Sequence, residues 1–229
     1  MRITHSPLLP LGSALDSRIM TSQKSDTVHL CGQDIQRPGH ICAFFDSRDD
    51  EYGVLLPYLK EGVDRGEKIV NVLDAARLED HERRLRDAGM RVDLGDVSVA
   101  ASEDTYLSNG RFEMERMARF VEDTVANAKA GGCRVRTAGW MNWLQQDAPG
   151  SDRAAEYEAR MNLLVPKYDC TFMCVYDLAQ LGGQGIVDII STHPWVILNG
   201  AIRKNEKFIP PEAYLDSLLS KQRTSRPVA

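Results

Sequence analysis

The sequence predicts an α/β fold in which a mainly parallel central sheet carries helices on both faces. Short apolar runs typical of buried strands alternate with longer segments whose apolar residues recur at every third or fourth position, which is the helical period. Residues 170–176 are continuously apolar, as expected of a central strand in a parallel sheet. This alternation favours parallel strands joined by right-handed helical crossovers.

The first clear unit spans residues 40–74. Residues 41–45 are aromatic and branched and predict a buried strand. After the acidic stretch 46–51, apolar residues at helical spacing predict a helix through residues 54–63, and residues 68–73 predict the next strand. The turn between the first strand and the helix therefore lies at the carboxyl end of the sheet, where open α/β folds bind ligands.

The remaining elements continue the alternation in chain order. We expect strands at residues 97–101, 133–139, 170–176 and 195–198, and helices at residues 75–88, 111–130, 152–165, 183–190 and from 211 onward. Residues 28–35 predict a short strand or hairpin, and the whole segment 28–221 is expected to form one domain. Residues 1–27 predict a disordered arm, and residues 222–229 a flexible tail.

The first strand-to-helix turn is acidic. Between Phe45 and Tyr52 there is no Gly and no Lys, so the turn lacks the parts of a phosphate-binding loop. Asp49, Asp50 and Glu51 complement the helix dipole themselves and should repel a triphosphate. We therefore expect no hydrolysis of ATP or GTP and no catalytic residues.

Four separated motifs resemble one known family. They are HICAFF, EYGVLLPYLKEGVDRGE, CVYDL and THPWVILNG, and they occur in the family's order over residues 28–220. The chain resembles the MEDS domain, a sensory domain of methanogens, methylotrophs and the regulator DcmR, and its first βαβ unit also looks like that of KaiC-like ATPases. The resemblance implies a three-layer RecA/KaiC-like fold that senses a small molecule, such as a hydrocarbon derivative, without ATPase activity.

Composition excludes several classes of function. A net charge of -5 and a pI of about 5.6 give no basic footprint for nucleic acid, and no apolar run is long enough to span a membrane. The five cysteines are odd in number and scattered, which does not indicate a disulfide framework. These features fit a protein of the reducing cytoplasm.

A metal or haem site is an alternative that four residues suggest. His40 and Cys42 share one side of a strand, because side chains two residues apart point to the same face, and Cys174 and His193 come from segments expected nearby. No paired Cys-x-x-Cys spacing supports the site, and buried cysteines are common as small apolar side chains. We therefore expect structural packing here, with no metal and no cofactor.

Covalent and acid-base chemistry find little support. There is no Gly-x-Ser-x-Gly nucleophile motif, and Glu156 and Glu158, two apart on a helix, point in different directions. An acyl-transfer enzyme is not expected.

Aromatic side chains cluster at the predicted strand ends and favour an apolar pocket there for a small organic ligand. The predicted pocket residues are His40, Cys42, Phe44, Phe45, Glu51, Tyr52, Tyr106, Trp140, Trp143, Cys174, Tyr176, Asp177 and His193.

Two functions from different classes remain open. The first is a non-catalytic sensory module that binds the organic ligand and signals to a separate protein partner in transcriptional or signal-transduction regulation, since no helix-turn-helix or kinase motif is present. The second is a KaiC-like nucleotide-binding protein. In either case we expect a homo-oligomer, because RecA-like relatives assemble through sheet edges and adjoining helices.

Overall fold

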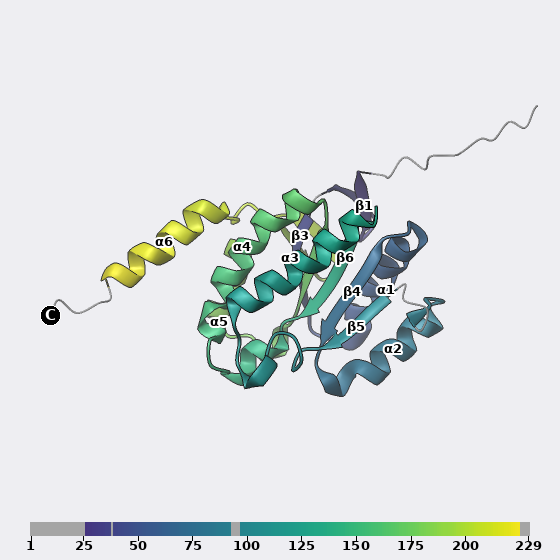
Figure 1. Cartoon of the computed structure of the whole chain (residues 1–229), viewed down its shortest axis with the longest axis horizontal. Coiled ribbons are helices and arrows are strands. Elements are labelled where there is room, and N and C mark those ends of the chain that lie inside the picture. The colour runs from purple at the N-terminus through teal and green to yellow at the C-terminus, as the bar shows by residue number, and fades with distance from the viewer. Residues whose placement is uncertain (1–25, 38, 93–96, 225–229) are drawn as a thin grey trace, which may run out of the picture.

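The computed structural model describes residues 26–37, 39–92 and 97–224, in which a seven-stranded sheet lies between two layers of helices (Figure 1). Its strand order is β5-β4-β6-β7-β3-β8-β9, and a two-stranded hairpin, β1-β2, stands beside it. Neighbouring strands from β5 to β8 are parallel, and β9 is antiparallel to β8. The predicted α/β class with a mainly parallel sheet is confirmed.

The bounds of the elements follow the predicted alternation. The strands are β1 Thr27–Leu30, β2 Gln33–Gln36, β3 Gly39–Phe45, β4 Lys68–Leu73, β5 Val97–Ala101, β6 Val135–Trp140, β7 Thr171–Asp177, β8 Trp195–Leu198 and β9 Ala201–Lys204. The α-helices are α1 Arg48–Asp64, α2 Leu78–Asp87, α3 Met114–Ala130, α4 Ala154–Tyr168, α5 Gly183–Thr192 and α6 Pro211–Thr224. Short 3₁₀ segments lie at Ala75–Arg77, Ser108–Gly110, Asn142–Gln146, Ser151–Arg153 and Leu178–Gln180.

Helix α1 begins within the acidic stretch, as expected from carboxylates that complement its dipole, and the Ser47 side chain caps it by accepting a hydrogen bond from the Asp50 backbone N–H at 3.2 Å. Two other features differ from the predictions. Strand β9 was not predicted. Helix α6 continues to Thr224, past the predicted start of the tail, while residues 225–229 and most of the predicted arm lie outside the described part of the chain.

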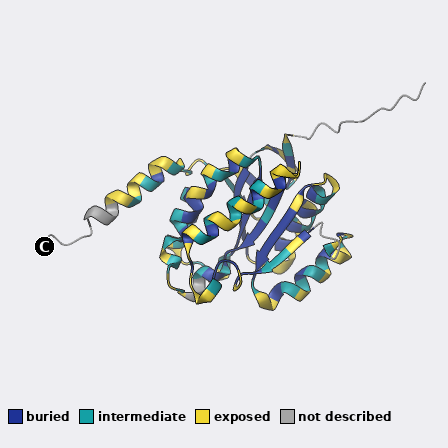
Figure 2. Ribbon diagram, in the orientation of Figure 1, coloured by how far each residue is buried: buried dark blue, intermediate teal, exposed yellow. Residues whose placement is uncertain are grey.

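The central strand β3 is buried along its whole length and divides the core into two halves. Cys42 and Phe44 point to the face covered by α3, α4 and α5, whereas Ile41, Ala43 and Phe45 point to the face covered by α1 and α2. Figure 2 shows the central strands as mostly buried and the helices that cover the sheet as exposed on their outer sides. The sheet therefore has two separate apolar cores, one on each face.

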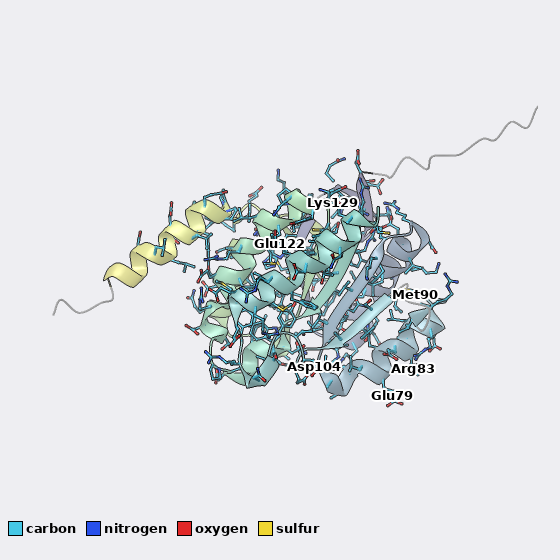
Figure 3. All side chains as sticks on the ribbon, in the orientation of Figure 1. Glu79, Arg83, Met90, Asp104, Glu122 and Lys129 are labelled. Carbon is cyan, nitrogen blue, oxygen red and sulfur yellow. The ribbon has the colours of Figure 1, made fainter. Side chains whose placement is uncertain are left out.

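The outer layer on the first face is tied together at its surface. Lys167 and Tyr168 of α4 both donate hydrogen bonds to Glu122 Oε1 of α3, at 2.6 and 2.7 Å, and Lys129 of α3 donates to the Lys167 carbonyl at 3.0 Å. Figure 3 labels Glu122 and Lys129 on the outer side of α3. Surface pairs of this kind add little stability individually, but they fix how α3 lies against α4.

Helix α6 contacts the outer side of α4 and projects away from the sheet (Figure 1). Tyr214 is buried at its first turns, whereas Leu219 is 55% exposed. No helix in the described residues has both the length and the apolar character needed to cross a bilayer.

Candidate functional site

Four side chains of polar chemistry meet in the core on the α4 face of the sheet. They are His40 of β3, Glu158 of α4, Cys174 of β7 and His193 at the end of α5, and all four are buried. Their nearest nitrogen, oxygen and sulfur atoms all lie within 4.8 Å of one another. Charged and titratable groups are rarely buried together in this way unless they are paired or bind a ligand.

The topology explains why these four residues meet. Strands β3 and β7 are parallel neighbours with Cys42 opposite Cys174, so His40 lies on the same face, one step along. Glu158 belongs to the inward face of α4, four residues after buried Ala154. His193 immediately precedes β8, which pairs with the other edge of β3.

Glu158 is at the centre of the cluster. Its Oε2 lies 3.2 Å from His40 Nε2 and 3.5 Å from His193 Nε2, and it accepts a hydrogen bond from the Cys174 thiol at 3.4 Å. Cys174 Sγ is also 3.5 Å from His40 Nε2. The Tyr176 hydroxyl donates to the other oxygen, Oε1, at 3.2 Å. Four polar side chains thus surround a single carboxylate.

Hydrogen bonds at the Nδ1 atoms orient both imidazole rings. His40 Nδ1 lies 3.1 Å from Asn162 Oδ1, and the Asn162 amide nitrogen donates to the Thr192 carbonyl at 2.8 Å. His193 Nδ1 lies 2.7 Å from the Ile189 carbonyl oxygen. Because carbonyl and amide oxygens only accept, both Nδ1 atoms carry the hydrogen, and each Nε2 faces Glu158.

Burial shapes the charge state of the cluster. Burial alone would raise the pKa of Glu158, but the neighbouring imidazoles of His193 and His40 hold it well below its usual range. Desolvation, aided by His193, lowers the pKa of His40, and desolvation together with Glu158 raises the pKa of the Cys174 thiol. The cluster is therefore a carboxylate facing a neutral thiol and an imidazole that resists a positive charge.

A cleft leads from the surface to this cluster. It has a volume of about 320 Å³ and lies between α4, α5 and the carboxyl end of β7, with Glu158 and Tyr176 among its inner residues. Its lining includes the apolar residues Leu144, Ala154, Ala155, Leu181 and Ile189 and the polar residues Ser151, Asp152, Asp188 and Thr192. A concave surface that combines apolar side chains with a small number of polar groups is the usual form of a small-molecule site.

Four of the predicted pocket residues lie on the opposite face of the sheet. Phe45, Glu51, Tyr52 and Trp140 belong to the α1 side, where all four are buried and Phe45 lines a cavity at the start of α1. Trp140 Nε1 donates to Glu51 Oε1 at 2.9 Å, and Arg77 pairs with the same carboxylate. The expectation that all these residues line one crevice is wrong, because consecutive strand residues alternate between faces.

The other predicted residues share the cluster's face but differ in role. Tyr106 and Trp143 belong to a stacked aromatic group with Phe112, with ring centroids 5.2 and 4.6 Å apart, and Trp143 is fully buried. Phe44 stacks on Tyr176 at 5.4 Å. The cavity of about 40 Å³ beside Tyr106 has room for little more than one water molecule.

The side chains of two further predicted residues already form hydrogen bonds within the protein. The Cys42 thiol donates to the Trp195 carbonyl at 3.6 Å and is not one of the four clustered residues, in which Glu158 takes the place that the sequence suggested for Cys42. Asp177 caps the 3₁₀ segment after β7 by accepting from the Ala179 backbone N–H at 2.9 Å.

A second cavity, of about 620 Å³, lies at the start of α1 beside the β1-β2 hairpin. Asp46, Asp49 and Asp50 line it and are exposed, and Ser47 already satisfies one free N–H group of the helix. A phosphate placed here would meet carboxylates instead of lysine and glycine N–H groups. The geometry agrees with the predicted absence of a phosphate-binding loop.

Glu158 and Asn162 were not predicted as site residues. Glu156 and Glu158 do point in different directions, as predicted: Glu156 pairs with Arg153 and Arg160 at the surface, and Glu158 points inward. The sequence feature that could have indicated Glu158 is its position within the buried stripe of its helix, where a carboxylate requires hydrogen-bond or charge partners.

The fold is similar to the crystal structure of a KaiC-like protein from the hyperthermophilic archaeon Pyrococcus horikoshii OT3, with a TM-score of 0.53 and 14% identity over 74% of this chain and 81% of that chain. The domain thus has a KaiC-like α/β fold. Residues 39–194 match the MEDS family, described as the MEthanogen/methylotroph, DcmR Sensory domain, and the chain belongs to this family. No curated protein sequence matches the chain.

Proposed function

We propose that this chain is a non-catalytic sensory module that binds a small organic molecule of low polarity in the cleft between α4 and α5. The family is one of sensory domains, and the cleft combines apolar residues on α4 and α5 with polar groups at Glu158 and Tyr176 and at its sides. This combination suits a hydrocarbon derivative with one polar group, since the walls accept the carbon chain and the inner end orients the polar atom.

The absence of catalysis is supported by the state of the thiols. Burial raises the pKa of Cys42 far above its ordinary value and that of Cys170 to about 12. A protonated thiol is a poor nucleophile, so these buried cysteines do not offer an activated sulfur. The acidic turn at the start of α1 likewise disfavours the alternative function of a nucleotide-binding protein.

The proposed signal passes to a separate protein partner through α6. Helix α4 carries Glu158 at the inner end of the cleft, and its outer residues Arg153, Glu156 and Arg160 form a groove with α6. Filling the cleft would change how α4 and α5 pack, and α6 would carry that change to its exposed apolar surface around Leu219. Exposed apolar residues on a protruding helix are typical of a protein-protein contact.

Two matched glycine variants test the cleft. Gly185 of α5 lines it, and Gly53 of α1 lines the acidic cavity on the other side. A Cβ added at either glycine meets no atom closer than 4.0 Å, so leucine fits the backbone at both positions. Gly185→Leu fills the α4-α5 cleft, and Gly53→Leu fills the other cavity.

The measurement is the melting temperature of the full chain with a panel of short alcohols, amines and halogenated alkanes and, separately, with ATP and Mg²⁺. A ligand that binds the folded state raises the melting temperature. We expect an organic compound to stabilise the wild type and Gly53→Leu but not Gly185→Leu. Loss of the response in Gly53→Leu alone, or a response to ATP alone, would overturn the proposal.

A further inference from the structure

We propose that His40, Glu158, Cys174 and His193 bind a divalent transition-metal ion of the Zn²⁺ type. This inference goes beyond the proposed sensory function and does not depend on it, because metal binding is measured without any organic ligand. The first support is geometric. Four of the separations among the donor atoms are 3.2, 3.4, 3.5 and 3.5 Å. A tetrahedral Zn²⁺ site with bonds of about 2.0–2.3 Å has edges of about 3.3–3.8 Å.

The second support is the orientation of the two imidazoles. Asn162 and the Ile189 carbonyl accept from the Nδ1 atoms, which leaves the Nε2 lone pairs of His40 and His193 directed at the centre of the cluster. Metal-binding histidines characteristically donate their other ring N–H to a carbonyl or carboxylate in this way. The Asn162 amide is itself oriented by the Thr192 carbonyl, so the arrangement is fixed before any ion enters.

The third support is an unmet electrostatic requirement. Within the described residues His193 Nε2 has no hydrogen-bond partner although it is fully buried, and the nearest Glu158 oxygen lies 3.5 Å away. A buried polar atom without a partner is unfavourable, since it has lost its hydrogen bonds to water. A cation at the centre of the cluster satisfies both Nε2 atoms and the carboxylate together.

The donor set indicates the kind of metal. One sulfur, two imidazole nitrogens and one carboxylate oxygen are ligands of intermediate softness, which suit Zn²⁺ and tetrahedral Co²⁺ rather than Mg²⁺ or Ca²⁺. The Cys174 thiol would lose its proton on binding, because a coordinating thiol is deprotonated by the ion. The cleft that ends at Glu158 provides an entry path.

The full-length protein, freed of metal with a chelator, tests the site by titration with Co²⁺ and by equilibrium dialysis with Zn²⁺. We expect one ion per chain and a thiolate-to-cobalt charge-transfer band in the near ultraviolet. Cys174→Ala should lose the band, and Cys42→Ala is the matched control, because it removes the buried thiol directly opposite on the neighbouring strand and should keep the band. Asn162→Ala should weaken Zn²⁺ binding about 10- to 100-fold as a positioning residue.

A measurement on the wild type alone keeps the test independent of how the variants fold. X-ray absorption of the Zn²⁺-loaded protein should show one sulfur at about 2.3 Å and nitrogen or oxygen at about 2.0–2.1 Å. Absence of saturable binding in the wild type, a shell without sulfur, or a band lost in Cys42→Ala and kept in Cys174→Ala would overturn the proposal. None of these outcomes affects the glycine test of the cleft.

Discussion

Protonation of His81 should destabilise the fold and thereby identify the α1 side of the sheet as structural. His81 is fully buried between α1 and β4, where its Nδ1 lies 3.0 Å from the Tyr52 hydroxyl. Its Nε2 accepts a hydrogen bond from the Asn71 amide nitrogen at 3.0 Å. A second ring proton would face that N–H group directly. Desolvation and the positive charge of Arg77 together lower the pKa of His81 to about 4, against an opposing effect of Asp80.

The sign and size of the effect follow from the difference between the two states. The unfolded chain binds the proton near pH 6.5 and the folded chain only near pH 4, so acid favours unfolding. The contribution of neutral His81 to the free energy of unfolding is complete above about pH 6.5, falls as the pH drops to about 4, and stays constant below that. A shift of about 2.5 units corresponds to about 3 kcal/mol of unfolding free energy.

Urea unfolding at pH 7.5 and at pH 4, for the wild type and His81→Gln, measures this contribution. Glutamine keeps a polar group at the site but does not titrate, so other carboxylates affect both proteins alike. The wild type should lose about 3 kcal/mol more than the variant between the two pH values. Equal losses would refute the reasoning and would show that water reaches His81.

Three further outcomes are expected. Trp140→Phe should lower the free energy of unfolding by about 1.5–3 kcal/mol, because Glu51 loses a buried hydrogen-bond donor. Chemical denaturation should show this loss without any change in ligand binding, whereas a variant as stable as the wild type would indicate that Trp140 belongs to a binding site. ATP with Mg²⁺ should neither raise the melting temperature nor be hydrolysed above a blank, since Asp49 and Asp50 crowd the start of α1, and measurable turnover would contradict this. Light scattering should detect self-association of the wild type, and a strictly monomeric mass at high concentration would contradict this expectation.

Most elements of the fold were predictable because the signals are local. The apolar runs of β3 and β7 and the helical spacing of α1 and α3 depend only on which residues are buried, and the structure places them as expected. The missed strand β9 had a local signal too. Asn199 and Gly200 both have positive φ angles, 50° and 67°, and an Asn-Gly pair between apolar runs is a strong sign of a tight hairpin.

The site was only partly predictable, because its strand residues and its helix residue Glu158 depend on different information. The period of two along a strand placed His40 and Cys42 on the same face of β3 without knowledge of the fold, whereas the presence of Cys174 on that face depends on the pairing of β3 with β7. Nearness to a strand end was a poorer guide. Trp140 is the last residue of β6 and Trp143 lies three residues later, yet the two pack on opposite faces of the sheet.

Glu158 required a further step that sequence alone supports in part. Its place in the buried stripe of α4, between Ala154 and Met161, shows that the carboxylate is buried and must find partners in the core. Which partners it meets depends on how α4 is rotated over β3 and β7, and that rotation is set by packing between residues far apart in the chain. A carboxylate on a buried helix stripe that crosses strands bearing His and Cys on the same face is therefore the pattern to seek in such domains, because burial forces these groups to meet.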